Sequence, residues 1–490
     1  MPAAFGLGVV LWLAAGFSEN RADTDTWIYL NFGREFFRGA GFLHRDVFAY
    51  VPTVRHWVFH EWLAGVLFYP VYAALGAAGL TLWKYLIGFS TAAAAYGASL
   101  RRGTPPRAAA AALPCGLSFV FSAFAPLRAQ VFTFLFLALT ILVLEDARGR
   151  ERPGRAFVLV PIFALWANLH GGFLAGLGVT AIYAAARAIE RRPLSPFLLL
   201  LLSSTAATLV NPYGFRLWTS VITHAAAPEA RVTEWDSVLR ALSLGENLWT
   251  VFAFFTAGAA AALLFARRLK SDLPAALTLA ALFILGLSHI RHVALFGLAL
   301  SIYGGRAAVD LWRARGVRRK AVFAALMAAF SPFAVVVLLQ NVGPLVRPDL
   351  AGSPLALECP SCPRGEGGDP CYPVGAVRYI REHGMKGKIA ANYAWGAFLS
   401  FFLNPGCLGA VDARCETVFP EDVRKAYFEF LTGGPRWRDF LAAYPPDMIL
   451  LRNGTVAAHL LSRDPAWKKT YEDEGSVLFT PRTPQPLSKR

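Results

Sequence analysis

Long apolar runs separated by short polar linkers dominate the first 342 residues of the chain. About 17 to 25 apolar residues are enough for a helix to cross a bilayer, and most of the runs have about this length. Eleven membrane-spanning helices are predicted, over residues 3–19, 78–99, 108–125, 129–145, 156–169, 172–190, 195–211, 247–266, 272–289, 293–311 and 320–342. The first run has no basic segment before it and no clear cleavage site, so it predicts a span and not a removed signal peptide.

Charge then sets the expected orientation. Of the residues, 56% are hydrophobic and 16% are charged, whereas soluble domains carry roughly 25% charged residues, so a soluble protein is excluded. The net charge of +16 comes from basic clusters in every second linker, the pattern of cytoplasmic loops and not of nucleic-acid binding. These clusters are Arg101, Arg102 and Arg107; Arg148, Arg150, Arg152 and Arg155; Arg191 and Arg192; Arg267, Arg268 and Lys270; and Arg313, Arg315, Arg318, Arg319 and Lys320. An odd number of spans places the amino terminus in the cytoplasm and the carboxy-terminal residues outside.

Residues 61–75 are the exception, because they are apolar enough to form a span. If they crossed the membrane, Arg101 and Arg102 would move outside and the alternation of basic linkers would break. We therefore predict that residues 25–39 and 58–75 form amphipathic helices on the outer surface, within one long first outer loop over residues 18–77.

The composition changes at about residue 343 to mixed polar sequence with glycine, proline and cysteine. Residues 374–383 have the periodicity of an amphipathic helix, and three short alternating segments predict strands. The strands are expected over residues 388–392, 448–451 and 476–480. The fold class is thus an α-helical polytopic membrane domain over residues 1–342, followed by a small extracytoplasmic α/β domain over residues 343–490.

Six cysteines raise the question of cross-linking. Cys115 lies in a span and is expected to be a packing residue. The other five, in the carboxy-terminal domain, are Cys359, Cys362, Cys371, Cys407 and Cys415. An oxidising compartment favours disulfides among them. Because five is an odd number, one thiol is expected to stay free or to pair elsewhere. A zinc site starting at the CPSC string is the alternative, but histidines at ligand spacing are absent.

Polar residues gather at the ends of the spans that are expected to face outward. Ionisable groups near membrane depth are costly, so they indicate function, although each alone is also compatible with a helix cap or an interfacial anchor. We predict a substrate-binding role for His60, Glu61, Arg128, Gln130, Asn168, His170, Asn211, Glu234, Arg291 and His292. Asp46, Asp236 and His289 lie on the same expected side.

Two carboxylates, Asp23 and Asp25, follow the first span in the string ADTDTWIYL. Such a pair binds a divalent cation such as Mg²⁺ or Mn²⁺ through its oxygens, or supplies a general base that removes a proton from an attacking hydroxyl. An acidic cap at the start of a helix is a third explanation. The sequence leaves all three open, and with them metal dependence.

Several strings resemble a known superfamily. The long first outer loop with its acidic motif resembles the GT-C superfamily of glycosyltransferases, which use polyprenyl-phosphate sugars. More closely, a bacterial group of GT-C-like membrane proteins has strings similar to DTDTWIYLNFGR, HEWLAGVLF, LRAQVFTFLF, LWANLHGGFL, NPYG, YAWGAFLSF and VDAR. The resemblance covers nearly the whole chain. It implies that Asp25 acts as general base or holds the acceptor, with Asp23 second, because Trp27 and Tyr29 match the aromatic residues that follow the acidic position. The chain departs from the mannosyltransferases in having no Asp-Glu pair, and from many oligosaccharyltransferases in having no second DxD string.

The resemblance implies transfer of a sugar from a polyprenyl-phosphate donor to a glycan, lipid or protein acceptor, at the outer face of the inner (cytoplasmic) membrane. An anionic leaving group needs cationic or hydrogen-bonding partners, for which Arg128, Arg291, His170 and His292 are candidates. A transporter or flippase of lipid-linked sugar is an alternative, but it would favour internal repeats and midplane polar groups. A membrane scaffold is the other alternative. Membrane lipids are expected partners and nucleic acid is not.

Overall fold

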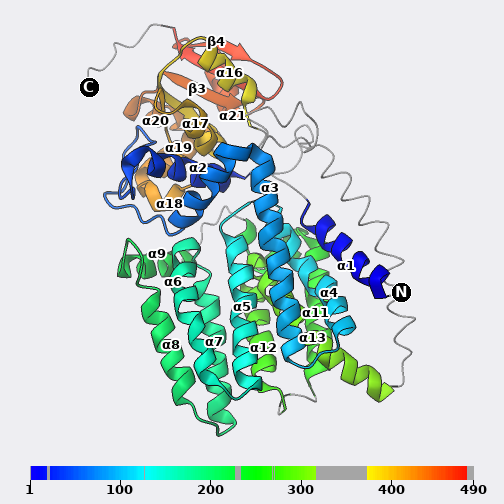
Figure 1. The fold of residues 1–490 in the computed structure, drawn as a ribbon. Helices are drawn as coiled ribbons and strands as arrows, with labels where there is room; N and C mark the ends of the chain where they lie inside the picture. The colour runs from blue at the N-terminus through cyan, green and yellow to red at the C-terminus, as the bar shows by residue number, and fades with distance from the viewer. Residues whose placement is uncertain are drawn as a thin grey trace. The chain divides into compact units, whose positions relative to one another are not determined.

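The computed structural model describes residues 2–18, 23–125, 127–226, 233–266, 269, 271–315 and 372–482. The chain divides into two compact units (Figure 1). The helical unit comprises Met1–Asn20 and Ala77–Gly352, and the sheet unit comprises Arg21–Gly76 and Ser353–Arg490. The first loop therefore belongs to the same unit as the carboxy-terminal residues, although more than 270 residues of sequence lie between them.

Helices form the helical unit because an apolar segment in lipid must satisfy its own backbone hydrogen bonds. Its helices are α1 (Pro2–Gly16), the part of α3 (Trp62–Arg101) that follows Gly76, α4 (Pro106–Phe124), α5 (Gln130–Gly149), α6 (Leu159–Leu169), α7 (Phe173–Ile189), α8 (Ser195–Ala207), α9 (Phe215–Ala226), α10 (Val238–Leu244), α11 (Leu248–Phe265), α12 (Leu273–Ser288) and α13 (Val293–Arg315). Each of the ten spans predicted up to residue 311 coincides with one of these helices. The eleventh, residues 320–342, lies outside the described part of the chain.

Five of the described helices are long and apolar enough to cross a membrane, among them α3, α5 and α11. The pair α4 and α13 packs closely, because Gly116 and Gly297 each face the backbone of the other helix where no Cβ would fit. Small residues at helix crossings are typical of membrane proteins. Helices α9 and α10 and the short turns η3 (Thr233–Trp235) and η4 (Ile290–His292) were not predicted from the sequence.

Gly76 interrupts α3 with φ 59° and ψ −150°, a backbone conformation that glycine adopts without steric cost. The segment before Gly76 belongs to the sheet unit and the segment after it to the helical unit. Two helices were expected here, over residues 58–75 and 78–99. The first of them starts later than expected, at Trp62, and Figure 1 shows both parts within the one element.

The sheet unit contains five strands in the order β2-β1-β3-β5-β4. They are β1 (Gly387–Ala391), β2 (Cys407–Gly409), β3 (Met448–Arg452), β4 (Trp467–Glu472) and β5 (Ser476–Pro481). Strands β2, β1 and β3 are parallel, whereas β5 and β4 are antiparallel additions to the edge at β3. Helices on the unit are α16 (Val374–Glu382), α17 (Gly396–Leu403), α18 (Cys415–Val418), α19 (Glu421–Thr432), α20 (Trp437–Ala443) and α21 (Val456–Arg463). The predicted helix and three predicted strands correspond to α16, β1, β3 and β5.

The first loop supplies α2 (Thr24–Glu35) and extends the sheet unit at its β2 edge. Tyr50 N donates to Gly409 O at 2.9 Å, and Gly409 N donates to Phe48 O at 2.8 Å. A further bond runs from Val54 N to Val418 O at 2.8 Å. Because an open strand edge has unpaired N–H and C=O groups, the loop covers an edge that would otherwise be exposed.

The cysteines differ from the sequence-based expectation. Cys407 in β2 and Cys415 at the start of α18 are both buried, and no disulfide joins these two described cysteines. No particular pairing was predicted, so the expected disulfides are not shown. Burial raises the pKa of Cys407 to about 11, which keeps its thiol protonated. Cys115 is exposed on α4, which contradicts the packing role expected for it. Cys359, Cys362 and Cys371 lie outside the described residues.

Candidate functional site

Two arginines share one carboxylate at the end of the helical unit where α5 begins and α12 ends. Arg128 precedes α5, Glu234 lies in η3, and Arg291 lies in η4. Arg128 Nη1 is 2.8 Å from Glu234 Oε2, and Arg291 Nη1 is 3.6 Å from Glu234 Oε1. We call these three residues the arginine cluster. Its side chains remain 19–32% exposed, so a ligand has access to them.

Aromatic rings surround Arg291. Its guanidinium lies 4.3 Å from the centroid of the Trp235 ring, a cation–π geometry. The rings of His289 and His292 are 5.3 Å apart, and His289 is 5.3 Å from Trp235. Within the described residues, Nδ1 of each histidine is buried and has no hydrogen-bond partner. A ring nitrogen donates or accepts according to its tautomer, so each of these atoms can take either role.

A backbone hydrogen bond fixes η4 next to the segment that follows η3. Ile290 N donates to Asp236 O at 3.0 Å. Trp235 and His289 were not among the predicted substrate-binding residues. Their signal in the sequence was the strings EWDS and SHIRH, in which each lies beside or near a predicted residue.

His170 and Asn168 lie at the end of α6. His170 Nδ1 is 2.8 Å from Thr133 Oγ1 on α5 and accepts from the N–H of Gly172 at 2.9 Å. Asn168 Nδ2 donates to Ala164 O and to Val210 O, both at 2.8 Å. Asn168 thus joins the ends of α6 and α8, the helix-end role that the sequence had left open.

Gln130 and Asn211 also make local contacts. Gln130 Nε2 donates to Ala123 O at 3.5 Å. Asn211 Oδ1 accepts from Tyr213 N at 2.8 Å, which closes the turn after α8. The helix ends of this unit therefore hold the predicted residues Arg128, Gln130, Asn168, His170, Asn211, Glu234, Arg291 and His292. Ion pairs join three of them, Arg128, Glu234 and Arg291.

The carboxylates of the first loop occupy the start of α2 in the sheet unit. Asp23 is the N-cap of this helix, and its Oδ1 accepts from Asp25 N at 2.9 Å. Asp25 lies in the first turn. Among the described residues, no group of three or more histidine, cysteine or acidic side chains is arranged to hold a metal ion. Asp23 therefore has the capping role that was one of its three explanations.

Glu61 and His60 lie near the same helix. Tyr29 Oη donates to Glu61 Oε2 at 2.9 Å, and His60 Nε2 is 3.7 Å from Glu61 Oε1. Asp25 and Tyr29 are four residues apart, so they share a face of α2. The structure thus brings Asp25, Glu61 and His60 to one side of α2.

Solved structures with the same architecture are glycosyltransferases. The oligosaccharyltransferase of Archaeoglobus fulgidus matches with a TM-score of 0.56 and 11% identity, over 92% of this chain and 69% of that chain. ArnT from Cupriavidus metallidurans matches with a TM-score of 0.55 and 14% identity, over 97% of both chains. The mycobacterial arabinofuranosyltransferase AftD matches with 0.54 and 15%, over 98% of this chain and 40% of AftD.

The chain has the GT-C fold. No family model and no curated protein matches the sequence, so this assignment comes from the arrangement of the helices and of the terminal sheet. The predicted fold class, a helical membrane bundle with a small α/β domain, is confirmed. The resemblance on which the sequence-based hypothesis depended is thereby confirmed at the level of the fold.

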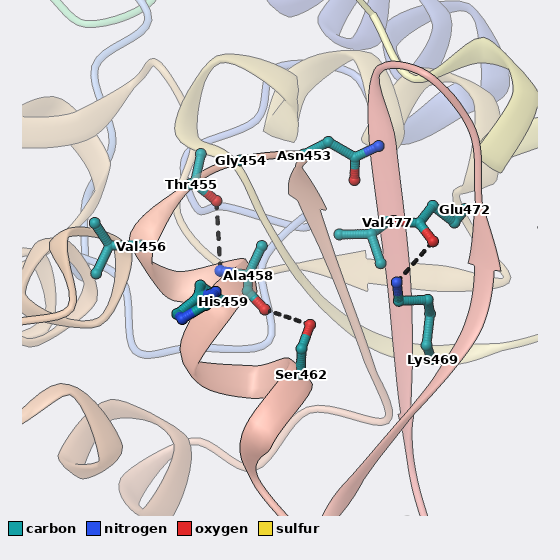
Figure 2. Close-up of a pocket in the computed structure, with 10 residues that line it drawn as sticks. All are labelled: Asn453, Gly454, Thr455, Val456, Ala458, His459, Ser462, Lys469, Glu472 and Val477. Atoms are coloured by element: carbon teal, nitrogen blue, oxygen red, sulfur yellow. Dashed lines mark hydrogen bonds and ion pairs between the residues drawn. The ribbon is translucent and has the colours of Figure 1, made fainter.

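The GT-C chain also has a cavity of about 470 Å³ in the sheet unit. Figure 2 shows it beside the start of α21 and strands β4 and β5. Its lining groups already have partners: Lys469 Nζ is 2.6 Å from Glu472 Oε2, Ser462 Oγ donates to Ala458 O, and Thr455 caps α21. None of the predicted site residues lines it.

Proposed function

We propose that this GT-C chain transfers a sugar from a polyprenyl-phosphate carrier to a hydroxyl of a glycan, lipid or protein acceptor. The observation that supports this most directly is the arginine cluster, in which one carboxylate is shared by two guanidinium groups. Among these three side chains, positive charge exceeds negative charge by one. Arginine and phosphate form strong charge-assisted hydrogen bonds, so the phosphate of a lipid carrier suits this position.

The reaction forms one bond and breaks one. The acceptor oxygen attacks the anomeric carbon of the sugar, the bond from that carbon to the phosphate oxygen breaks, and the electron pair stays on the phosphate. Arg128 and Arg291 stabilise the charge that develops on this leaving group, and His292 and His170 are further contacts to it. The proton of the acceptor hydroxyl goes to a general base.

We assign the general base to Asp25. Asp23 uses an oxygen to cap α2, whereas Asp25 lies on the face of α2 that carries Tyr29 and its partner Glu61. Glu61 and His60 are proposed to hold the acceptor beside it. Gln130, Asn168 and Asn211 complete the proposed substrate-binding residues. The alternative for the two aspartates is a site for Mg²⁺ or Mn²⁺.

Replacing Asp25 tests the assignment. A general base contributes about 10²- to 10⁴-fold in rate, so Asp25→Asn should lower transfer of sugar by about this factor without changing expression or insertion. The measurement is transfer from a synthetic polyprenyl-phosphate sugar to an acceptor by purified protein. Asp23→Asn is the matched control and should lose less. Full activity of Asp25→Asn would refute the assignment, whereas equal losses that depend on added Mg²⁺ would indicate a metal site.

The proposed location is the inner (cytoplasmic) membrane, with the amino terminus in the cytoplasm and the carboxy-terminal domain outside. This orientation is supported by the basic linkers, such as Arg101 and Arg102, that alternate with polar ones. A reporter that works only in the cytoplasm should be active when fused after Arg102 and silent when fused after Gly454. Activity after Gly454 would reverse the orientation.

A further inference from the structure

Helix α2 has two polar faces with different partners. Trp27, Asn31 and Arg34 are separated by four and three residues, so they form one stripe along the helix. Asp25 and Tyr29 belong to another stripe. Gly33 continues that second stripe, where it packs against the backbone of Gly65 too closely for any side chain. The stripe opposite to the proposed base is the one whose side chains contact the carboxy-terminal residues.

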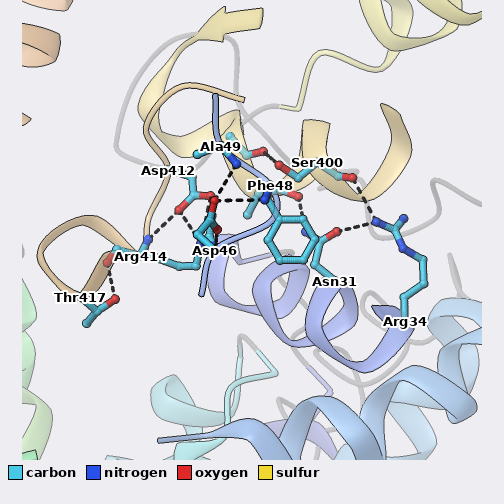
Figure 3. Close-up of polar contacts among 11 residues, drawn as sticks. Asn31, Arg34, Asp46, Phe48, Ala49, Ser400, Asp412, Arg414 and Thr417 are labelled. Carbon is cyan, nitrogen blue, oxygen red and sulfur yellow. Dashed lines mark hydrogen bonds and ion pairs between the residues drawn. The ribbon is translucent and has the colours of Figure 1, made fainter. Parts of the chain in front are cut away.

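The first stripe binds α17 from its second residue to its last turn. Asn31 Nδ2 donates to Ala397 O at 2.8 Å, and Arg34 donates through Nη2 to Ser400 O at 3.3 Å and through Nη1 to Phe401 O (Figure 3). Arg34 Nη2 also donates to Asn31 Oδ1 at 3.1 Å. Ser400 O also accepts from Asn404 N at 3.2 Å, whereas Phe401 O belongs to the last turn of α17, whose carbonyls have no partners within the helix. Asn31 and Arg34 thus bond backbone carbonyls along the length of α17.

Trp27 adds a buried apolar contact to the polar ones. It is fully buried, and its ring lies 5.1 Å from that of Phe398 and 5.3 Å from that of Phe402, both on α17. Such ring pairs stabilise packing beyond their buried area. The contact between α2 and α17 thus has one anchor near the start of α2 and two near its end, which leaves little freedom for rotation.

A second set of contacts holds the loop that follows α2. Arg414 is buried and pairs with Asp412 at 2.7 Å and with Asp46. Burial alone would lower the pKa of Arg414, but the carboxylates of Asp412 and Asp46 raise it above its ordinary value. Asp46 Oδ2 also accepts from Ala49 N at 2.7 Å (Figure 3). The loop is therefore fixed to the carboxy-terminal residues at both α2 and Asp46.

We propose that the carboxy-terminal residues belong to the catalytic machinery, because α17 sets the orientation of α2 and hence of Asp25. Arg34 is the principal positioning residue, and Asn31 supports it. This inference depends on the proposed role of Asp25 as general base. It assigns the sheet unit a role in orienting the base, although the proposed base itself lies within 25 residues of the start of the chain.

The test compares Arg34→Met with Arg38→Met. Methionine keeps a long apolar side chain but removes the donors to Ser400 O and Phe401 O. Arg38 is exposed and contacts Glu35 at 3.2 Å, so its replacement is a matched control. A misplacement of about 1 Å costs up to about 10²-fold in rate, so Arg34→Met should lower kcat by about 10- to 100-fold with KM for the lipid donor unchanged. Arg34→Lys should recover part of the loss.

Combining the variants separates positioning from loss of folded protein. If Arg34 acts through Asp25, Arg34→Met should cause no further loss in residual transfer when Asp25 is already Asn, because coupled residues are non-additive. An equal fractional loss in both backgrounds, or wild-type kcat in Arg34→Met, would overturn the inference. Full activity of Asp25→Asn alone would instead refute the proposed function, so the two failures are distinguishable.

Discussion

The two ends of the helical unit both pair arginines with carboxylates, but they bury these groups to different extents. Where α5 begins, Glu234 lies between Arg128 and Arg291. Near the other end of α5, Arg102 lies between Glu145 and Asp272. Arg102 and Glu145 are 4% and 6% exposed, whereas Arg291 and Glu234 are 19% and 32% exposed. One end therefore has a surplus of guanidinium groups in reach of solvent, and the other has a buried guanidinium with two carboxylates.

Burial explains the difference. An isolated charge inside a protein is very costly, so the buried guanidinium of Arg102 needs the two carboxylates that pair with it. Tyr183 Oη donates to Glu145, and the Arg102 guanidinium lies 4.6 Å from the Tyr303 ring centroid. The arginine cluster is under no such constraint, because water reaches it. We infer that the buried cluster stabilises the bundle and that the exposed one is the better place for an anionic substrate.

The largest expected effects come from replacing one arginine of each cluster, Arg102 or Arg291, with methionine. Removing one partner of a buried ion pair costs about 3–5 kcal/mol, so Arg102→Met should lower the free energy of unfolding by about that amount while folded molecules keep their activity. Arg291→Met should instead lower the rate of sugar transfer and leave the free energy of unfolding nearly unchanged. Removing one group that stabilises developing charge costs about 10²- to 10³-fold in kcat, with little change in stability. Thermal unfolding and sugar transfer, both in detergent, measure the two effects.

Surface arginines serve as controls for this crossed pair. Arg150 pairs with Asp146 at 2.8 Å and Arg240 with Asp236 at 3.0 Å, and both arginines are exposed. Exposed pairs contribute only about 0–1 kcal/mol, so neither methionine variant should change either measurement much. Loss of transfer without loss of stability in Arg102→Met would show that the buried cluster takes part in the reaction, and the comparison would fail.

The helices were predictable because membrane spans need little beyond length and hydrophobicity. The same pattern predicted that Arg128, Glu234 and Arg291 lie on one side of the bundle, because every second linker between spans is on the same side of the membrane. Their pairing did not follow, because it depends on η3 and η4, two short turns without a sequence period. Trp235 and His289 were missed for the same reason, although they lie next to or near residues that were predicted.

Long-range contacts were the other limit. The spacing of Trp27, Asn31 and Arg34 identifies a face of α2, but its partner α17 lies 366 residues away for the Asn31 contact, and no local pattern points to it. The disulfide prediction, which followed from the expected compartment, named no pairs, and Cys407 and Cys415 are not joined to each other. A disulfide also needs the two Cβ atoms within about 3.5–4.5 Å, which only the fold determines.

The smallest expected effect is on the affinity for the lipid product and comes from Glu234. Gln keeps the size and the hydrogen-bonding oxygen of this side chain but removes the charge that lies between Arg128 and Arg291. In a site reached by water, an interaction between unit charges is about 1 kcal/mol, which corresponds to about fivefold in affinity. Glu234→Gln should therefore bind polyprenyl phosphate about fivefold more tightly, as measured by competition with the donor.

Asp236→Asn is the control for this prediction. It removes the same charge two residues away, where the carboxylate pairs with Arg240, and should leave the affinity unchanged. If Glu234→Gln binds the lipid phosphate more weakly, or if Asp236→Asn strengthens binding equally, the shared carboxylate does not compete with the phosphate and the arginine cluster is a structural contact like the one around Arg102.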